Sequence, residues 1–352
     1  MKRAYLQIII LYCLKKLQGQ RTIYSILHLL NGKKSSQTIQ DAHLFQLTRL
    51  FKTFEQLSRD ELDRYTEDME RQSWISNNEI GHYTITPEGE RILQDVLLKC
   101  PLPTSLNGWK HHKSTDVFWG RLSLLVQVIS HLNNHHTKYL PVQKKTSIHK
   151  WLKSFLLTSG SARNEVGIIL YKELLKCFEG LCDISPAVLT LRLTGHNRIG
   201  LTAEQAAEQL GLGLAYYRIQ FLAALHYLME CVGRNPGSFP LMDKVLSGLD
   251  ESIPLTLSTE KTYNLLNQGL SIDEIAKIRR LKRSTIEDHV VELALNVSGF
   301  DITPYVSNNI QESILHAAHR SNSRQLKHIR QLIPQAEYFE IRLVLARFGE
   351  GK

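Results

Sequence analysis

The chain has 352 residues, of which 43% are hydrophobic and 22% are charged. This composition is that of a globular protein, and it excludes a wholly disordered, collagen-like or mucin-like chain. Lysines and arginines number 43 and acidic residues 34, so the net charge is +9 and a polyanionic partner is suggested.

The five cysteines are scattered and include no C-x-x-C pair. They predict neither a disulfide framework nor a zinc ribbon, and they favour a reducing, cytoplasmic compartment. An apolar run over residues 4–14 follows Lys2 and Arg3, but Gln7 interrupts it and no small-residue cleavage site follows. The run is too short for a bilayer, which takes about 20 residues. We therefore expect a buried first helix and no membrane association.

Residues 1–100 begin with a series of predicted helices. Apolar residues predict helices over 4–17 and 22–30, separated at Gly19. Apolar residues then recur at spacings of three and four over 44–54, which predicts another helix there.

A hairpin and a further helix are predicted next. Residues 58–61 match the Ser-x-x-Glu capping box that begins a helix. The β-prone runs 74–75 and 83–85 flank a polar stretch and predict a hairpin, after which Thr86 and Pro87 begin a helix as N-cap and first helical residue. Helices followed by a small hairpin and a helix resemble a winged helix-turn-helix domain. A helical domain with an incidental hairpin is the alternative.

A domain boundary is predicted at 101–108, where proline and polar residues accumulate, and a helical middle domain is predicted over 104–250. The positive charge is concentrated in residues 1–50 and 101–150, and in the second block it is mixed with histidine and aromatic residues. This mixture is typical of surfaces that contact phosphates and unstacked bases, whereas a solvated helical face over an aromatic core is the alternative. The residues of these two blocks that we predict to contact DNA are Lys33, Lys34, Lys110, Lys113, Lys144, Lys145 and Lys150.

No enzyme motif is recognisable. The P-loop, dinucleotide-binding, zinc-protease and serine-hydrolase patterns are absent, and Ser147 with Lys150 matches S-x-x-K only as a short pattern expected by chance. His131 and His135 have the i, i+4 spacing that metal sites use, but no Cys, Asp or Glu stands close by in the sequence to complete a set of ligands. We predict a protein that is not an enzyme and that has no cofactor or metal site.

The most specific pattern lies near the C-terminus. A helix over 259–268 ends at Gly269, Ser271 and Glu274 form a capping box for a short second helix, and a third helix follows Leu281. The pattern Gly-x-Ser-x-x-Glu-Ile-Ala, followed by Thr-Ile-x-x-His, is that of a helix-turn-helix and is most like the LuxR-type version.

The segment from about residue 255 to the end, including 326–334 and 338–346, is similar to the helix-turn-helix domain at the C-terminus of many RecQ-type helicases. The whole chain resembles the YpbB family of Bacillus-type proteins, whose members are often encoded beside a RecQ-like helicase. This resemblance implies a helicase-associated domain over 255–352 and an accessory protein that works with a RecQ-like helicase.

One position departs from the LuxR-type pattern, because Lys282 stands where the third helix usually has a serine or similar N-cap. The third helix then carries one arginine against three acidic residues. This balance disfavours base reading and favours a phosphate grip by the basic cluster before the helix. The residues that we predict to contact DNA here are Arg279, Arg280, Lys282, Arg283, Ser284, Thr285 and His289.

We therefore expect a mainly α, multidomain protein with a winged-helix-like N-terminal part, a helical middle and a C-terminal helix-turn-helix. The leading hypothesis is a cytoplasmic, non-enzymatic DNA-binding accessory protein of low sequence specificity, acting with a RecQ-like helicase in DNA repair or recombination. One alternative is an adaptor whose helix-turn-helix docks on a helicase. Another is a transcription regulator.

Overall fold

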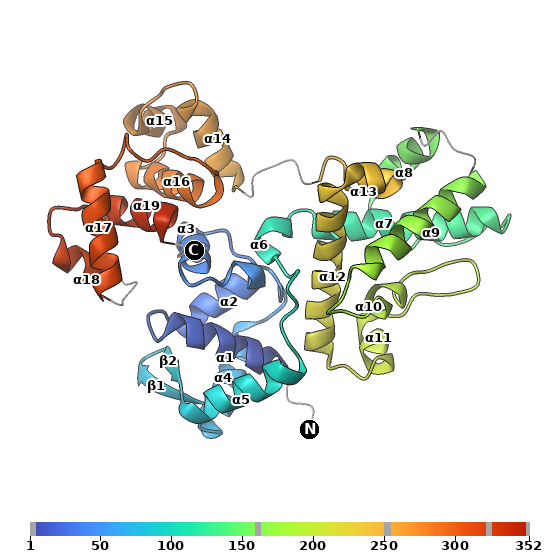
Figure 1. Ribbon diagram of the computed structural model, residues 1–352, viewed down its shortest axis with the longest axis horizontal. Coiled ribbons are helices and arrows are strands. Elements are labelled where there is room, and N and C mark those ends of the chain that lie inside the picture. Colours follow the sequence, from blue (N-terminus) through green and yellow to red (C-terminus); the bar gives the residue numbers. More distant parts are fainter. Residues whose placement is uncertain (1–4, 159–162, 250–254, 322–325, 350–352) are drawn as a thin grey trace. The chain divides into compact units, whose positions relative to one another are not determined.

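The computed structural model describes residues 5–158, 163–249, 255–321 and 326–349. These residues are mainly helical and contain one two-stranded antiparallel sheet, which confirms the predicted fold class (Figure 1). The chain divides into two compact units, one of residues 10–92 with 252–352 and the other of residues 1–9 with 93–251. In the described part of the chain, no helix has both the length and the apolar character needed to span a membrane.

The N-terminal elements follow the predicted order of helices, hairpin and helix. Strands β1 and β2 pair antiparallel with Ile75 opposite Ile85, as the sequence predicts. Ser58 and Glu61 form the predicted capping box, and the Gly89 amide donates to Thr86 Oγ1 (3.1 Å) at the start of the next helix. The elements are α1 (Tyr5–Leu17), α2 (Ile23–Asn31), α3 (Ser36–Leu44), α4 (Arg59–Arg71), β1 (Ile75–Glu79), β2 (His82–Ile85) and α5 (Pro87–Lys99).

The prediction of a helix over 44–54 is wrong, because this stretch folds mainly as turns. Helix α3 ends at Leu44, Gln46 has a left-handed φ of 55°, and the Leu47 amide donates back to the Ala42 carbonyl (2.7 Å). Only the short 3-10 helix η1 (Thr48–Leu50) follows. The apolar residues of this stretch are buried, but they fill the core from successive turns, so their spacing reflects burial and not a helical period.

Helix α3 instead lies earlier in the chain, where no helix is predicted. Every side chain from Thr38 to Leu44 is buried, although several of them are polar. Arg21 donates to both oxygens of Asp41 (2.9 and 3.0 Å), and Arg342 donates to Gln40 Oε1 (2.9 Å). The helix packs between the N-terminal elements and the C-terminal helices α16 and α19.

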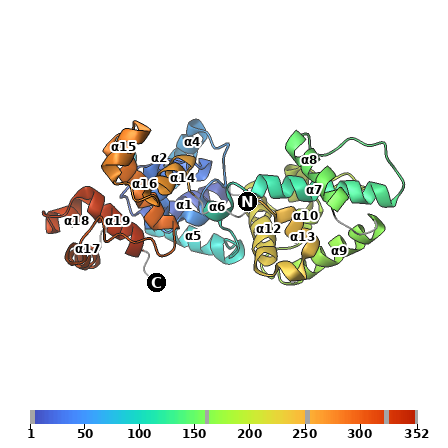
Figure 2. The same cartoon turned by 90° about the horizontal axis from the view of Figure 1, so that it is seen from above.

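The C-terminal helices surround one apolar core, to which Ile286, Val290, Ile314, Ile329 and Val344 belong. Figure 2 shows α17, α18 and α19 from above, at one end of their unit. The division into three domains over 1–100, 104–250 and 255–352 stays a prediction. Contacts of α3 with α16 and α19 join the N- and C-terminal segments in one unit. The helices are α14 (Leu257–Leu266), α15 (Ile272–Arg279), α16 (Arg283–Asn296), α17 (Asn308–Ser321), α18 (Leu326–Leu332) and α19 (Tyr338–Phe348).

The other unit is built around α12, which contacts α7, α9, α10, α11 and α13. The α12 residues Tyr217, Ala224 and Leu228 are almost completely buried. The elements are α6 (Gly108–His111), α7 (Thr115–Asn133), α8 (Thr146–Thr158), α9 (Arg163–Glu179), α10 (Ala187–Thr190), α11 (Ala203–Gln209), α12 (Leu214–Arg234), η2 (Pro236–Ser238) and α13 (Pro240–Leu246).

Candidate nucleic-acid interface

The predicted helix-turn-helix is formed by α14, α15 and α16. The Ser271 amide donates to Glu274 Oε2 (2.8 Å) and the Glu274 amide donates to Ser271 Oγ (3.3 Å), which is the predicted capping box at the start of α15. At its other end, α15 closes with the Leu281 amide donating to the Ala276 carbonyl (3.0 Å). The local hydrogen bonds therefore set where the turn begins and ends.

The turn between α15 and α16 presents positive charge to solvent. Arg280, which ends α15, and Lys282, which precedes α16, are exposed, and so is Lys277 on α15. None of these three cations forms an ion pair with a described residue. Lys277 was not among the predicted contacts, because only the folded turn shows that it shares this surface.

The start of α16 strengthens this positive potential. Lys282 occupies the N-cap position and makes no capping hydrogen bond through its side chain. The first amides of α16 are therefore not capped by a side chain, and the helix dipole adds partial positive charge at this end. Ser284 is exposed and Thr285 is half-buried in the first turn. Such a helix terminus is suited to a phosphate.

Arg283 is engaged within the domain. Its Nη1 lies 2.6 Å from both carboxylate oxygens of Asp273, and its Nε lies 2.9 Å from Glu287 Oε1. These two ion pairs balance its charge, and the pair with Asp273 joins the starts of α15 and α16. Arg283 is thus less available to a phosphate than its exposed neighbours.

The remaining acidic residues of α16 also have partners inside the unit. Asp288 pairs with Arg342 of α19 (2.6 Å). Glu292 is buried and accepts hydrogen bonds from Thr256 Oγ1 (3.0 Å) and Thr259 Oγ1 (2.6 Å) at the start of α14. The negative charge that disfavoured DNA binding in the sequence is therefore used to hold α14, α16 and α19 together.

Arg279 and His289 were predicted as DNA contacts, but the structure places them between helices. Arg279 donates to the Ser258 carbonyl (2.8 Å), to Ser258 Oγ (3.0 Å) and to Thr262 Oγ1 (2.5 Å). His289 is buried, with Nδ1 2.8 Å from Thr262 Oγ1. Burial, together with the charge of Arg279, lowers the pKa of His289 to about 4. Both side chains connect α14 to the rest of the helix-turn-helix.

We expect Arg279→Ala to lower the free energy of unfolding by about 1.5–3 kcal/mol, the usual contribution of hydrogen bonds to a charged group. Arg279→Lys should restore little, because an ammonium cannot reach Ser258 and Thr262 with the planar fork of a guanidinium. Urea denaturation followed by circular dichroism measures both variants. An Arg279→Ala variant as stable as the wild type would show that these bonds to α14 contribute nothing.

The first basic block lies in the same unit as the helix-turn-helix. Lys33 and Lys34 are exposed in the turn between α2 and α3. Lys33 Nζ lies 3.4 Å from His28 Nε2. By contrast, α4, which directly precedes the hairpin, carries six acidic residues and three arginines. The acidic charge of α4 repels a phosphate backbone, so the turn with Lys33 and Lys34 is the better candidate for a phosphate contact in this part of the chain.

The second basic block lies in the other unit, and its members differ. Lys110 Nζ is 2.5 Å from Glu230 Oε1, so its charge is balanced, and Lys113 is half-buried. Lys144, Lys145 and Lys150 are exposed before and within the first turns of α8. Among the predicted contacts of this block, these three lysines present their charge to solvent.

The aromatic residues of the second block are buried or half-buried. Trp109 and Phe118 are buried, and the Tyr139 ring stacks on His131 at 4.0 Å between ring centroids. Trp151 lies beneath the guanidinium of Arg121 (4.9 Å). These contacts favour the alternative stated above, in which a basic face covers an aromatic core.

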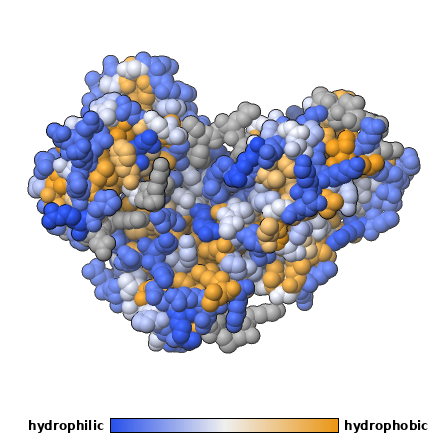
Figure 3. Space-filling model, in the orientation of Figure 1, coloured by the Kyte–Doolittle hydropathy of each residue, from blue (hydrophilic) through white to orange (hydrophobic). Residues whose placement is uncertain are grey.

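An apolar groove of about 640 Å³ lies between α7 and α9 in this unit. Its lining includes Ile168, Tyr171 and Leu175, which are partly exposed on α9, and contains no charged side chain. Figure 3 shows apolar residues gathered over α8 and α9. A surface of this kind does not bind phosphate, so the cation-rich turn of the helix-turn-helix is the stronger candidate for nucleic acid.

Comparison with known proteins identifies the same segment as a helix-turn-helix domain. Residues 258–345 match a family model described as a helix-turn-helix domain, which confirms the predicted motif and suggests DNA binding. The chain is 35% identical over 349 residues to Protein YpbB of Bacillus subtilis (strain 168), and the match covers 97% of each chain. No solved structure matches the chain significantly.

Proposed function

The chain belongs to the YpbB family, and from this premise we propose that it is a cytoplasmic, non-enzymatic DNA-binding accessory protein that acts with a RecQ-like helicase in DNA repair or recombination. The observation that carries the DNA-binding part is the turn of the helix-turn-helix, where Lys277, Arg280 and Lys282 are exposed beside the N-terminus of α16. Helix-turn-helix proteins place that end of the recognition helix, here α16, against the duplex.

The contact is mainly with phosphates and reads little sequence. Beyond the exposed cations, α16 offers only Ser284 as a fully exposed polar side chain in its first turn. Glu287 is paired with Arg283, and Val291 is buried. Phosphate contacts position a protein on DNA without specifying a sequence, so affinity should depend more on salt than on base composition.

Fluorescence anisotropy with the full-length protein on duplex, single-stranded and forked DNA tests this proposal. We expect binding to all three and a log–log salt slope of about −0.9 for each phosphate contact on duplex, measured between about 50 and 200 mM salt. Scrambling the duplex sequence should change affinity little. Absence of binding below about 10 μM protein at the lowest salt would contradict the proposal.

A second candidate, an adaptor that docks on a helicase, is favoured by exposed apolar residues of the same domain. Leu257 and Ile278 expose 75% and 58% of their surface. A pull-down of the cognate RecQ-like helicase with the Ile278→Glu variant tests this role. Ile80→Glu is the control, because it makes the same substitution at an exposed isoleucine on the hairpin turn. Loss of capture in Ile278→Glu alone, with DNA affinity retained, supports the adaptor. Equal capture by both variants and the wild type counts against docking through this residue.

A further inference from the structure

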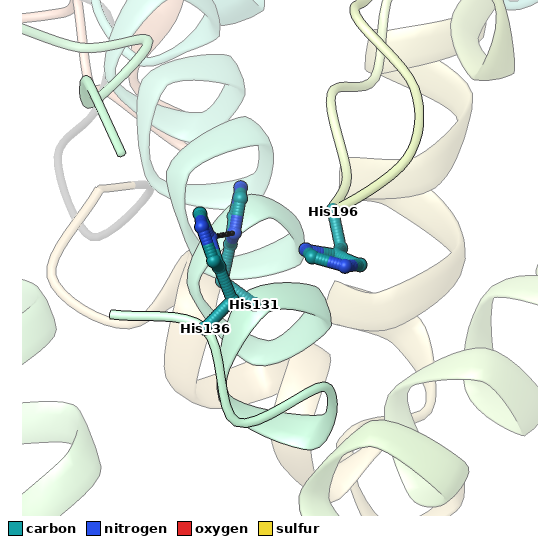
Figure 4. A group of neighbouring side chains, drawn as sticks. All are labelled: His131, His136 and His196. Atoms are coloured by element: carbon teal, nitrogen blue, oxygen red, sulfur yellow. Dashed lines mark hydrogen bonds between the residues drawn. The ribbon is translucent and has the colours of Figure 1, made fainter. Parts of the chain in front are cut away.

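Three histidines from different segments meet at the C-terminal end of α7. His131 lies in the last turn of α7, His136 follows the helix, and His196 lies in the loop between α10 and α11. One ring nitrogen of each lies within 4.8 Å of the corresponding nitrogens of the other two. Figure 4 shows the rings of His131 and His136 side by side, with His196 facing them across a gap.

The end of α7 brings His131 and His136 together. The His136 amide donates to the His131 carbonyl (3.0 Å), and the His135 amide donates to the Leu132 carbonyl (3.1 Å). This pair of bonds is a Schellman motif, and His135 takes its left-handed position with a φ of 55°. The i, i+4 pair noted in the sequence, His131 with His135, is therefore not the pair that meets.

His196 is held in place by its own loop. The Gly195 amide donates to the Arg198 carbonyl (2.8 Å), and the His196 amide donates to Ser130 Oγ (3.0 Å) on α7. A Cβ atom on Gly195 would lie 2.8 Å from Ser130 Oγ, so a side chain there would displace the hydroxyl that accepts from the His196 amide. The approach of His196 to the other two histidines thus depends on the backbone and not on a metal.

The chemistry of the three rings fits a metal ion. His131 Nδ1 and His136 Nδ1 are 3.1 Å apart, close to the roughly 3.4 Å between nitrogens that share a tetrahedral zinc at bond lengths of about 2.0–2.1 Å. His196 has a buried Nδ1 with no hydrogen-bond partner among the described residues. Buried polar atoms in native proteins usually have a partner, and a metal ion would supply one here.

We propose that His131, His136 and His196 form a metal-binding site for Zn²⁺, with three imidazole ligands and a fourth position for water. Imidazole ligands suit zinc, and three histidines with one open position are an established coordination for it. His136 is exposed, so an ion can enter from solvent. The bound ion would tie the loop around His196 to the end of α7 and stabilise this unit.

Calorimetric titration of Zn²⁺ into tag-free, chelator-treated full-length protein tests the site. We expect one ion per chain and a rise in melting temperature on zinc addition. His136→Ala and His196→Ala should each weaken zinc binding by at least about 10- to 100-fold. That is the usual loss when a residue that only supports a metal ligand is replaced, and loss of a ligand itself should cost no less. Co²⁺ bound to the wild type should show the visible absorption of a tetrahedral complex.

His135→Gly is the matched control. It removes a neighbouring imidazole that is not in the cluster, and glycine suits the left-handed backbone there. This variant should bind zinc like the wild type. No binding by the wild type, or equal binding by the wild type, His136→Ala and His196→Ala, would overturn the proposal. Melting of each metal-free variant against the metal-free wild type shows that lost binding does not come from unfolding.

Discussion

The double variant Arg280→Gly, Lys282→Ser should bind DNA more weakly than the wild type and yet be more stable. Arg280 has a φ of 52°, a left-handed conformation that costs a residue with a side chain about 1–2 kcal/mol. Lys282 occupies the N-cap of α16 without capping it, and serine there typically contributes about 0.5–2 kcal/mol. Because glycine also makes the unfolded chain more flexible, which offsets part of these gains, we expect the free energy of unfolding to rise by about 1–3 kcal/mol.

The same double variant removes two of the three exposed cations of the turn. Each lost phosphate contact should lower the magnitude of the log–log salt slope by about 1. Anisotropy titrations over a range of salt, with thermal melts of the same preparations, measure both effects. Because the variant is expected to be more stable, a loss of DNA affinity cannot be attributed to unfolding.

Arg64→Ser with Arg71→Ser is the matched control, because it makes the same charge change in the acidic helix α4 of the same unit. This pair should leave both affinity and salt slope near the wild-type values. An unchanged slope in the Arg280→Gly, Lys282→Ser variant would exclude the turn as a phosphate contact. Exposed Lys144, Lys145 and Lys150 would then be the next residues to replace.

The turn thus retains two residues that are poor choices for local stability. Arg280 and Lys282 each occupy a position where a different residue type would be favoured. Local rules are most often broken at positions with a functional role. This conflict between backbone preference and charge supports the assignment of the turn as the contact surface.

Acidification should destabilise the unit that contains the helix-turn-helix through His289. Its pKa is about 4 in the folded protein, against 6.5 for an unperturbed histidine. Between these values the unfolded chain binds the proton more readily than the folded one. The stability contributed by neutral His289 is therefore complete above pH 6.5 and is lost as the pH falls toward 4. The full loss amounts to about 3 kcal/mol.

Urea denaturation at several pH values between about 7.5 and 4.5 measures this loss. His289→Gln keeps a hydrogen-bonding group near Thr262 but does not titrate, so its stability should fall less steeply than that of the wild type. His319→Gln, at an exposed position on α17, is the control and should follow the wild type. Parallel curves for wild type and His289→Gln would refute the buried, neutral state of this ring.

Local signals in the sequence predicted the elements that carry the candidate site. The capping boxes of α4 and α15, the Thr86 cap and the hairpin all formed as predicted. These signals succeed because each joins groups within a few residues of one another, where chain connectivity alone brings donor and acceptor together. The sequence therefore determined the helix-turn-helix and placed its turn correctly.

Predicting helices from the spacing of apolar residues failed for residues 36–54, where long-range packing decides which side chains are buried. Helix α3 carries few apolar residues, yet it is buried. Its polar side chains Gln40, Asp41 and His43 lie on faces that different parts of the unit cover. The stretch after it is rich in apolar residues spaced like a helix, yet it folds as turns. An amphipathic pattern reports one buried face, so it misleads when a helix is covered all round or when turns fill a core.

The sequence by itself determined the mainly helical fold, the helix-turn-helix and an overall excess of positive charge. Only the tertiary structure decided which charges are available, because the partner of a long side chain can come from anywhere in the chain. Arg279 and Arg280 are adjacent, but one is engaged by α14 and the other is exposed at the turn. His131 and His196 are likewise 65 positions apart and meet only after folding. Helical and capping hydrogen bonds are local, whereas the partners of long side chains are set by packing.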